Sequence, residues 1–209
     1  MNSRVLLPLA TLALVVLAGC SPAPVRSTDN PAFVSAYQAR FLQLQEISDW
    51  TVLGKLAISD GTEGGSGSLS WHHHPGETRM SFRGTLGKGA WRLEANPAEA
   101  RLELADGSVH TARTVAQLVL NQVGWKVPVD ALAWWVKGLA QPGDWELREL
   151  DEQGRITTLR QFGWDVEFGA YTDQQDQWLP SRLTARRGDY LVKLAVRRWE
   201  FQANGSELE

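Results

Sequence analysis

Trp50-Thr51-Val52-Leu53-Gly54-Lys55-Leu56-Ala57-Ile58-Ser59 is the stretch that decides the fold of this chain. Val52, Leu56 and Ile58 fall on one face of an extended strand together with Gly54, and Thr51 and Lys55 fall on the other. This alternation predicts a strand with one face in a core and one in water. The same period returns along the chain, in Leu69 and Trp71, Met80 and Phe82, Trp91 and Leu93, Leu102 and Leu104, Trp164, Val166 and Phe168, and Val192, Leu194 and Val196.

Turn signals separate these runs and join them into an antiparallel meander. Asp106-Gly107 is typical of a tight hairpin, and residues 152–154 and 187–189 carry similar signals. The phase of the last strand changes between Val196 and Trp199, which predicts a β-bulge. About ten short strands of this kind predict a mainly β (α+β) fold, either an incomplete antiparallel β-barrel or a strongly curved sheet. Helices should cover its concave face, because an uncovered apolar face would aggregate.

Three segments carry helical signals. Pro31 follows the polar Asn30, and an apolar stripe continues from it to Ser48. Residues 114–117 form a capping box that opens a helix ending at Gly124. A third helix is expected from Asp130 to Gly138, between the two groups of strands.

The first twenty residues predict a lipoprotein signal. Arg4 precedes an apolar run over residues 5–18, which is shorter than the roughly 20 residues of a membrane span. The run ends in Leu17-Ala18-Gly19-Cys20, the lipobox pattern, and Cys20 is the only cysteine of the chain. The alternative is an ordinary signal with a chance cysteine. We predict a signal peptide over residues 1–19, with a covalent N-acyl diacylglycerol on Cys20 as the membrane anchor and no other cofactor.

The residues after the anchor predict a tether and one domain. Residues 20–30 have little to bury and are interpreted as a lipidated flexible tether, and residues 31–209 as a single domain. Ser21 directly after the cysteine favours sorting to the outer membrane, with the domain on its periplasmic face. The net charge of −3 without a basic block argues against nucleic acid as a partner.

No constellation typical of an enzyme is present. His72, His73 and His74 are consecutive, so their side chains cannot converge on one metal ion, and the following Pro75-Gly76 predicts a hairpin loop there. The glycine-rich residues 61–67 lack the Lys-Ser/Thr ending of a phosphate loop. Ser66 and Ser68 do not fit the spacing of a nucleophile elbow. We therefore predict a non-enzymatic protein without a metal site.

A series of short motifs between about Trp50 and Trp199 has a recognisable order. They are Trp71, Leu86-Gly87, Pro97, Leu102, Leu104, Asp106-Gly107, Gly124-Trp125, Val127-Pro128-Val129, Leu132-x-x-Trp135-x-x-Gly138-Leu139, Gln161-x-Gly163-Trp164-x-Val166, Tyr171, Leu179-Pro180 and Trp199. In this order, and together with the lipobox, the chain resembles the LolB family of outer-membrane lipoprotein receptors, which accept lipoproteins from the soluble periplasmic carrier LolA.

The resemblance implies an apolar cavity for the acyl chains of client lipoproteins and a loop with an exposed leucine that helps to insert the client into the inner leaflet of the outer membrane. That residue falls on Leu86, where the family usually has a preceding proline and this chain has Thr85. The expected partners are LolA, client lipoproteins and that leaflet, and the expected state is a monomer. The candidate cavity residues are Trp50, Val52, Leu56, Trp71, Met80, Phe82, Trp91, Leu93, Leu118, Trp135 and Leu139.

Three other interpretations stay open at this point. Any of the cavity candidates can be plain core, because sequence does not separate a cavity wall from packing. A structural lipoprotein that contacts outer-membrane proteins without binding lipid is the alternative function. The carrier itself is a third, although a soluble shuttle should lack a lipobox.

Overall fold

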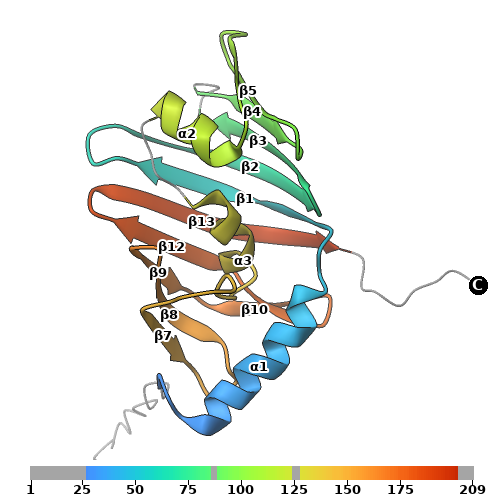
Figure 1. The fold of residues 1–209 in the computed structure, drawn as a ribbon, viewed down its shortest axis with the longest axis vertical. Helices are drawn as coiled ribbons and strands as arrows, with labels where there is room; N and C mark the ends of the chain where they lie inside the picture. The colour runs from blue at the N-terminus through green and yellow to red at the C-terminus, as the bar shows by residue number, and fades with distance from the viewer. Residues whose placement is uncertain (1–26, 86–88, 124–127, 202–209) are drawn as a thin grey trace, which may run out of the picture.

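The computed structural model describes residues 27–85, 89–123 and 128–201, and its main feature is one large, curved antiparallel sheet (Figure 1). Eleven strands follow the order β6-β5-β4-β3-β2-β1-β13-β12-β9-β8-β7, and β10 and β11 form a separate hairpin. The sheet does not close, because β6 and β7 remain its two edges. The mainly β prediction and the open, curved sheet are therefore confirmed. The strands are β1 (Trp50–Ser59), β2 (Gly64–His74), β3 (Glu77–Gly84), β4 (Trp91–Ala95), β5 (Ala100–Leu104), β6 (Val109–Ala112), β7 (Leu147–Leu150), β8 (Ile156–Gln161), β9 (Trp164–Phe168), β10 (Tyr171–Gln174), β11 (Gln177–Pro180), β12 (Arg182–Arg187) and β13 (Tyr190–Phe201).

β1, over residues 50–59, is the central strand of this sheet. β1 pairs with β2 on one side and with β13 on the other, which joins the first and last strands of the chain. Its pairing with β13 shifts by one residue after Leu53, so that Leu53 lies opposite Arg198 and Gly54 opposite Val196. This is the bulge that the phase change predicted. A side chain at Gly54 would come within 2.4 Å of the Ala195 carbonyl oxygen, so glycine is required where the bulged strand approaches.

In the described part of the chain, three helices accompany the sheet. α1 (Pro31–Gln45) begins where predicted, with the Asn30 side chain accepting a hydrogen bond from the Ala32 amide at 3.0 Å. It ends three residues before the predicted Ser48, and none of the described helices is long and apolar enough to cross a membrane. α2 (Val115–Val123) is capped by Thr114, whose hydroxyl accepts from the Gln117 amide at 3.2 Å. α3 (Val129–Trp135) is followed by Gly138, whose φ of 75° ends the helical turn.

α2 and α3 lie on the connection between the two edges of the sheet. The chain leaves β6 at one edge, passes through both helices across the concave face, and enters β7 at the other edge (Figure 1). The concave face is therefore covered by the segment that links the two halves of the sheet. This agrees with the expectation that helices protect that face.

The core is divided into two clusters. The larger contains Leu44, Trp135 and Trp164 and joins α1 and α3 to the part of the sheet from β2 through β1, β13, β12, β9 and β8 to β7. The smaller contains Leu93, Ala100, Leu102 and Leu118 and joins α2 to β4 and β5. Met80 and Trp91 pack against both clusters, so the boundary between them runs beneath the two concave-face helices.

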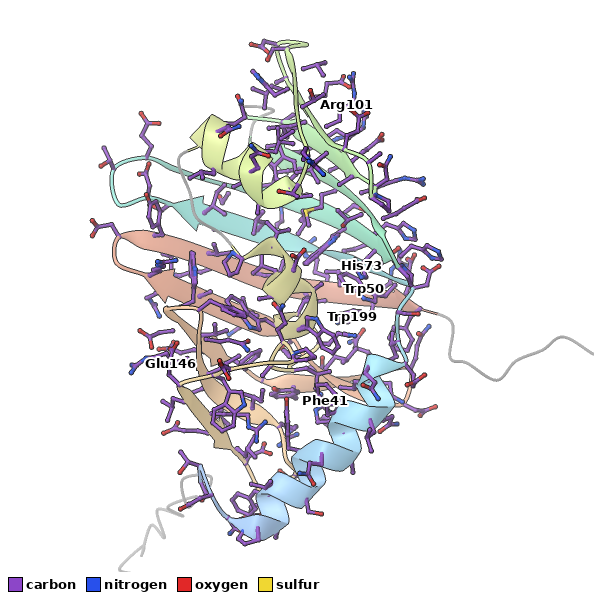
Figure 2. All side chains as sticks on the ribbon, viewed as in Figure 1. Phe41, Trp50, His73, Arg101, Glu146 and Trp199 are labelled. Atoms are coloured by element: carbon purple, nitrogen blue, oxygen red, sulfur yellow. The ribbon has the colours of Figure 1, made fainter. Side chains whose placement is uncertain are left out.

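The histidine run is part of a strand, and the prediction of a hairpin loop over it was wrong. β2 extends through His74, and only the following Pro75 and Gly76 form the turn. The three side chains have separate partners: His72 contacts the Thr51 hydroxyl, His73 stacks on Trp50, and His74 pairs with Asp49 at 2.9 Å. Figure 2 shows His73 beside Trp50, at one end of the sheet.

A buried lysine holds the end of α1 to the turn after α3. Lys137 is 6 % exposed, and its Nζ donates to the Leu44 and Ile47 carbonyl oxygens at 3.2 Å each. It also lies 4.8 Å above the centre of the Trp134 ring. These contacts satisfy carbonyls at the C-terminal end of α1, where a cation is favoured. Burial away from water nevertheless lowers the pKa of Lys137 to about 8.

We expect this lysine to make stability depend on pH in the alkaline range. Its folded pKa lies below the ordinary value of 10.5, so the unfolded chain binds more protons between pH about 8 and 10.5. The free energy of unfolding should then rise with pH across that window, by about 3 kcal/mol at most. Urea unfolding at several pH values gives the free energy of unfolding of the wild type and of Lys137→Met. The difference between these two free energies isolates the effect, since the contributions of other titrating groups cancel. A difference that stays constant from pH 7 to 10.5 would contradict this assignment.

Candidate functional site

An apolar cavity of about 190 Å³ lies between the concave face of the sheet and the two helices that cover it. Strands β1, β3, β4, β5 and β13 supply its floor, and α2 and α3 supply its roof. Gln122 is the one polar side chain among its lining residues. The lining residues are Leu56, Ile58, Met80, Trp91, Leu93, Leu102, Leu104, Val115, Val119, Gln122, Val129, Leu132 and Val192.

Two further spaces adjoin this cavity and share walls with it. A smaller one of about 60 Å³ lies deeper under α3 and shares Leu56, Met80 and Leu132 with the main cavity. A wider one of about 850 Å³ shares Ile58, Trp91 and Gln122 with it. The wider space includes the polar turn residues between β1 and β2, and we call it the mouth. The lining of these spaces thus changes from partly polar at the mouth to apolar in the interior.

The mouth also reaches the loop that contains the predicted insertion residue. Thr85 and Gly89, the described residues on either side of residues 86–88, both line it. The Thr85 hydroxyl donates to the Ser66 carbonyl oxygen at 3.0 Å, which fixes the start of the loop to β2. Leu86 itself lies outside the described residues, as does Cys20. Their roles therefore stay predictions.

A buried glutamine holds α3 over the sheet. Gln161, at the end of β8, is fully buried. Its Oε1 accepts from the Trp135 indole at 3.0 Å and from the Gln141 amide at 3.1 Å. Its Nε2 donates to the carbonyl oxygens of Gln141 at 2.8 Å and Asp144 at 3.1 Å. Every strong hydrogen-bonding position of this amide is occupied, so it joins β8, α3 and the segment after α3.

α2 is attached to a different part of the molecule. Its Leu118 is 1 % exposed and packs with Leu93 and Leu102 in the smaller core cluster. α3 itself is bonded to β8 through Trp135 and Gln161, the turn after it is bonded to the end of α1 through Lys137, and Trp135 packs in the larger cluster. The two halves of the roof thus belong to different packing units, and the cavity lies where these units meet.

The structure divides the predicted cavity residues into three groups. Leu56, Met80, Trp91 and Leu93 line the main cavity, and Trp71 lines the deeper space. Phe82 lines the mouth. The other five are buried packing residues. Trp50 contacts Trp71 and Trp199 at one end of the sheet (Figure 2), and the Trp135 indole donates to Gln161. Val52 and Leu139 are fully buried in the larger core cluster, and Leu118 packs in the smaller one.

Sequence reasoning missed several of the lining residues. Leu102, Leu104 and Val192 were recognised as strand residues, but nothing in their alternation distinguished cavity wall from core. Val115 and Val129 stand at the first positions of α2 and α3, where the hydrophobic pattern is weakest. Ile58, Val119, Gln122 and Leu132 complete the missed set.

By its fold, the protein belongs to the class of open antiparallel sheets that curve around an apolar cavity and carry helices on the concave face. Solved structures share this fold: a LolA superfamily protein from Nitrosomonas europaea aligns with a TM-score of 0.54 at 7 % identity, covering 79 % of this chain and 93 % of that one. A DUF1329 family protein from Desulfovibrio piger aligns with a TM-score of 0.50 at 6 % identity, covering 84 % and 95 %. At such low identity these likenesses show the fold alone.

Sequence comparison then identifies the family. The profile described as "Outer membrane lipoprotein LolB" matches residues 48–199. The outer-membrane lipoprotein LolB of Pseudomonas fluorescens (strain Pf0-1) is 35 % identical over 191 residues, which cover 90 % of this chain and 92 % of that protein. That of Pseudomonas aeruginosa (strain LESB58) is 33 % identical over 198 residues, covering 94 % and 97 %. The chain belongs to the LolB family.

Family membership settles several of the sequence-based predictions. It confirms the suspected resemblance, and it makes the chain an outer-membrane lipoprotein with a role in lipoprotein localisation rather than an enzyme. The outer-membrane localisation inferred from Ser21 is confirmed in the same way. The described residues contain no group of three side chains that could hold a metal ion.

Proposed function

We propose that this protein receives lipoproteins from the periplasmic carrier LolA, holds their acyl chains in the cavity under α2 and α3, and releases them into the outer membrane. The observation that carries this proposal is the cavity itself. All but one of its lining side chains are apolar, and it leads to a mouth whose walls include polar turns. A space of this composition suits a hydrocarbon chain and no charged or strongly polar ligand.

The energetics of such a transfer require no external energy source. An exposed acyl chain costs about 0.8 kcal/mol per methylene in water, so a client must pass directly from one apolar site to the next. Transfer then runs downhill if this cavity binds more tightly than the carrier and the bilayer more tightly than the cavity. Each tenfold step in affinity needs only about 1.4 kcal/mol.

The cavity must enlarge before it can hold a client. Its volume of about 190 Å³ is below the roughly 300–1,000 Å³ of typical ligand sites. We infer that the roof opens where α2 and α3 meet, because α2 packs on β4 and β5 through Leu118 while α3 is held by Gln161 and Lys137. Separating these two packing units opens the roof between α2 and α3 without unfolding either unit.

We assign release of the client to the loop at the mouth, which contains Leu86, and to the lipid anchor on Cys20. Burying a leucine stabilises a folded protein by about 1.5–3 kcal/mol, so an exposed Leu86 would gain that energy in a bilayer instead. Lipidation of Cys20 keeps the protein at the membrane and distinguishes a stationary receptor from a diffusible carrier of similar fold. Two or more acyl chains are needed for such stable anchoring.

A transfer assay tests this function. LolA loaded with a fluorescent lipoprotein is mixed with the purified receptor, and the two are then separated by size and charge. We expect the label to move to the receptor without added nucleotide. Label that remains on the carrier at every receptor concentration would exclude the receptor function and favour the structural lipoprotein that binds no lipid.

Filling the cavity should block uptake. Val119 on α2 lines the cavity, whereas the next residue, Leu120, is 40 % exposed and lies outside the lining. We expect Val119→Trp to weaken binding of a fluorescent fatty acid at least tenfold, because the indole takes the space of the acyl chain. Leu120→Trp, on the same helix, should bind within about twofold of the wild type. Equal affinities in both variants would show that acyl chains bind elsewhere.

A further inference from the structure

A second apolar space, separate from the cavity, lies on the outside of the molecule beside α1. It is a surface groove of about 420 Å³ between α1 and the segment that leads into β7. Two of its residues are large, apolar and exposed: Leu42 on α1 is 63 % exposed and Trp145 is 42 % exposed. Phe41, which Figure 2 shows pointing from α1 toward the sheet, forms part of the wall. The lining residues are Tyr37, Gln38, Phe41, Leu42, Ala140, Gln141, Pro142, Gly143, Trp145 and Arg148.

Arg148 is the only charged residue among those lining the groove. Its guanidinium lies between two aromatic rings, 4.0 Å from the centre of Tyr37 and 4.5 Å from the centre of Trp145. Its Nε is buried and has no hydrogen-bond partner. No carboxylate in the described residues forms an ion pair with it. A partly buried guanidinium without an anion is costly, and its planar donors match a phosphate or carboxylate.

The position of the anchor places this groove near a membrane. The backbone of Ser27 exchanges two hydrogen bonds with Leu150, at 2.9 and 2.8 Å, and Leu150 lies two residues from Arg148 on β7. Six residues separate Cys20 from Ser27, and the chain between these two Cα atoms reaches at most about 25 Å. Lipid on Cys20 therefore keeps Ser27, and with it the nearby end of the groove at Arg148, close to the bilayer surface. The β3 and β4 strands, which flank the Leu86 loop, lie toward the other end of the longest axis (Figure 1).

We propose that this groove binds the headgroup of an anionic phospholipid, with the phosphate on Arg148 and with Trp145 and Leu42 in the interfacial region. The proposal rests on the anchor at Cys20 and is independent of lipoprotein transfer. Tryptophan is favoured at the level of the headgroups, and Arg148 supplies the charge that an anionic lipid needs. Because the groove beside α1 and the strands β3 and β4 lie far apart along the longest axis, both regions meet the bilayer only when that axis lies along it.

A fluorescence experiment on the mature, lipidated protein tests this site. Cys20 carries the lipid, so Leu42→Cys introduces the one free thiol, which is labelled with an environment-sensitive dye. The protein is reconstituted into phosphatidylcholine vesicles with or without phosphatidylglycerol. We expect the dye emission to shift to shorter wavelength only with phosphatidylglycerol. The added substitution Arg148→Gln should abolish this shift, and Arg148→Lys should retain most of it.

Arg182→Gln is the matched control, because it removes an exposed cation of β12 that lies outside the groove. It should leave the shift unchanged. The fraction of protein that floats with the vesicles reports the anchor separately from the groove. Equal emission in both lipid mixtures, or an intact shift in Arg148→Gln, would overturn the proposal. A shift that appears only when the carrier is added would also overturn it, because the groove would then dock a protein.

Discussion

Replacing Gln161 with leucine is expected to lower the free energy of unfolding by about 3 kcal/mol or more. The substitution nearly conserves volume but removes four hydrogen bonds, and it leaves the buried Trp135 indole and three backbone groups of Gln141 and Asp144 without a partner. A buried polar group without a partner costs about 1–3 kcal/mol, and these costs are not additive. Urea unfolding followed by tryptophan fluorescence measures the loss.

Gln43→Leu provides the matched comparison, because Gln43 is exposed on α1. That variant should change the free energy of unfolding by less than about 0.5 kcal/mol. If both variants were equally stable, Gln161 would not hold α3 to the sheet. The inferred opening of the roof where α2 and α3 meet would then lose its main support.

Leu86→Glu is expected to separate acceptance of a client from its delivery. The variant should take lipoproteins from the carrier normally, because the cavity residues are unchanged. Its delivery to vesicles should fall by at least about 100-fold, since a charge in the hydrocarbon costs about 2.5–3.5 kcal/mol and the leucine contribution is lost as well. The measurement is the rate at which labelled client appears in floated vesicles. Leu86→Ile should deliver at nearly the wild-type rate, and normal delivery by the glutamate variant would refute the insertion role.

The alternation of side chains was enough to predict most of the sheet. A period of two in β1, β3 and β9 reflects burial of one face, which is a local consequence of the fold. The bulge was visible for the same reason, because an extra residue changes the phase of the pattern. The β10–β11 hairpin was not resolved as a separate unit. Its turn is formed by Gln175 and Asp176, both with positive φ, where a glycine or asparagine would have been the usual signal.

The candidate site was less predictable than the fold. Trp50 and Trp91 both point inward from strands, yet one is packed in the core and the other lines the cavity. The difference depends on where α2 and α3 cross the sheet, which no local pattern encodes. The structural role of Gln161 was not predicted from the sequence, where this residue appears only within a family motif, because a glutamine near the end of a strand is usually solvated. Its four partners come from segments distant in sequence.

Entry of acyl chains into the cavity under α2 and α3 is tested most directly by photocrosslinking. A client lipoprotein carrying a photoreactive group near the end of one acyl chain is transferred from the carrier and irradiated, and the modified peptides are identified by mass spectrometry. We expect modification of cavity residues, first of Leu56, Met80 and Leu132, which line both the main and the deeper space. Modification confined to the outer groove at Leu42 and Trp145, or to the convex face, would contradict the account.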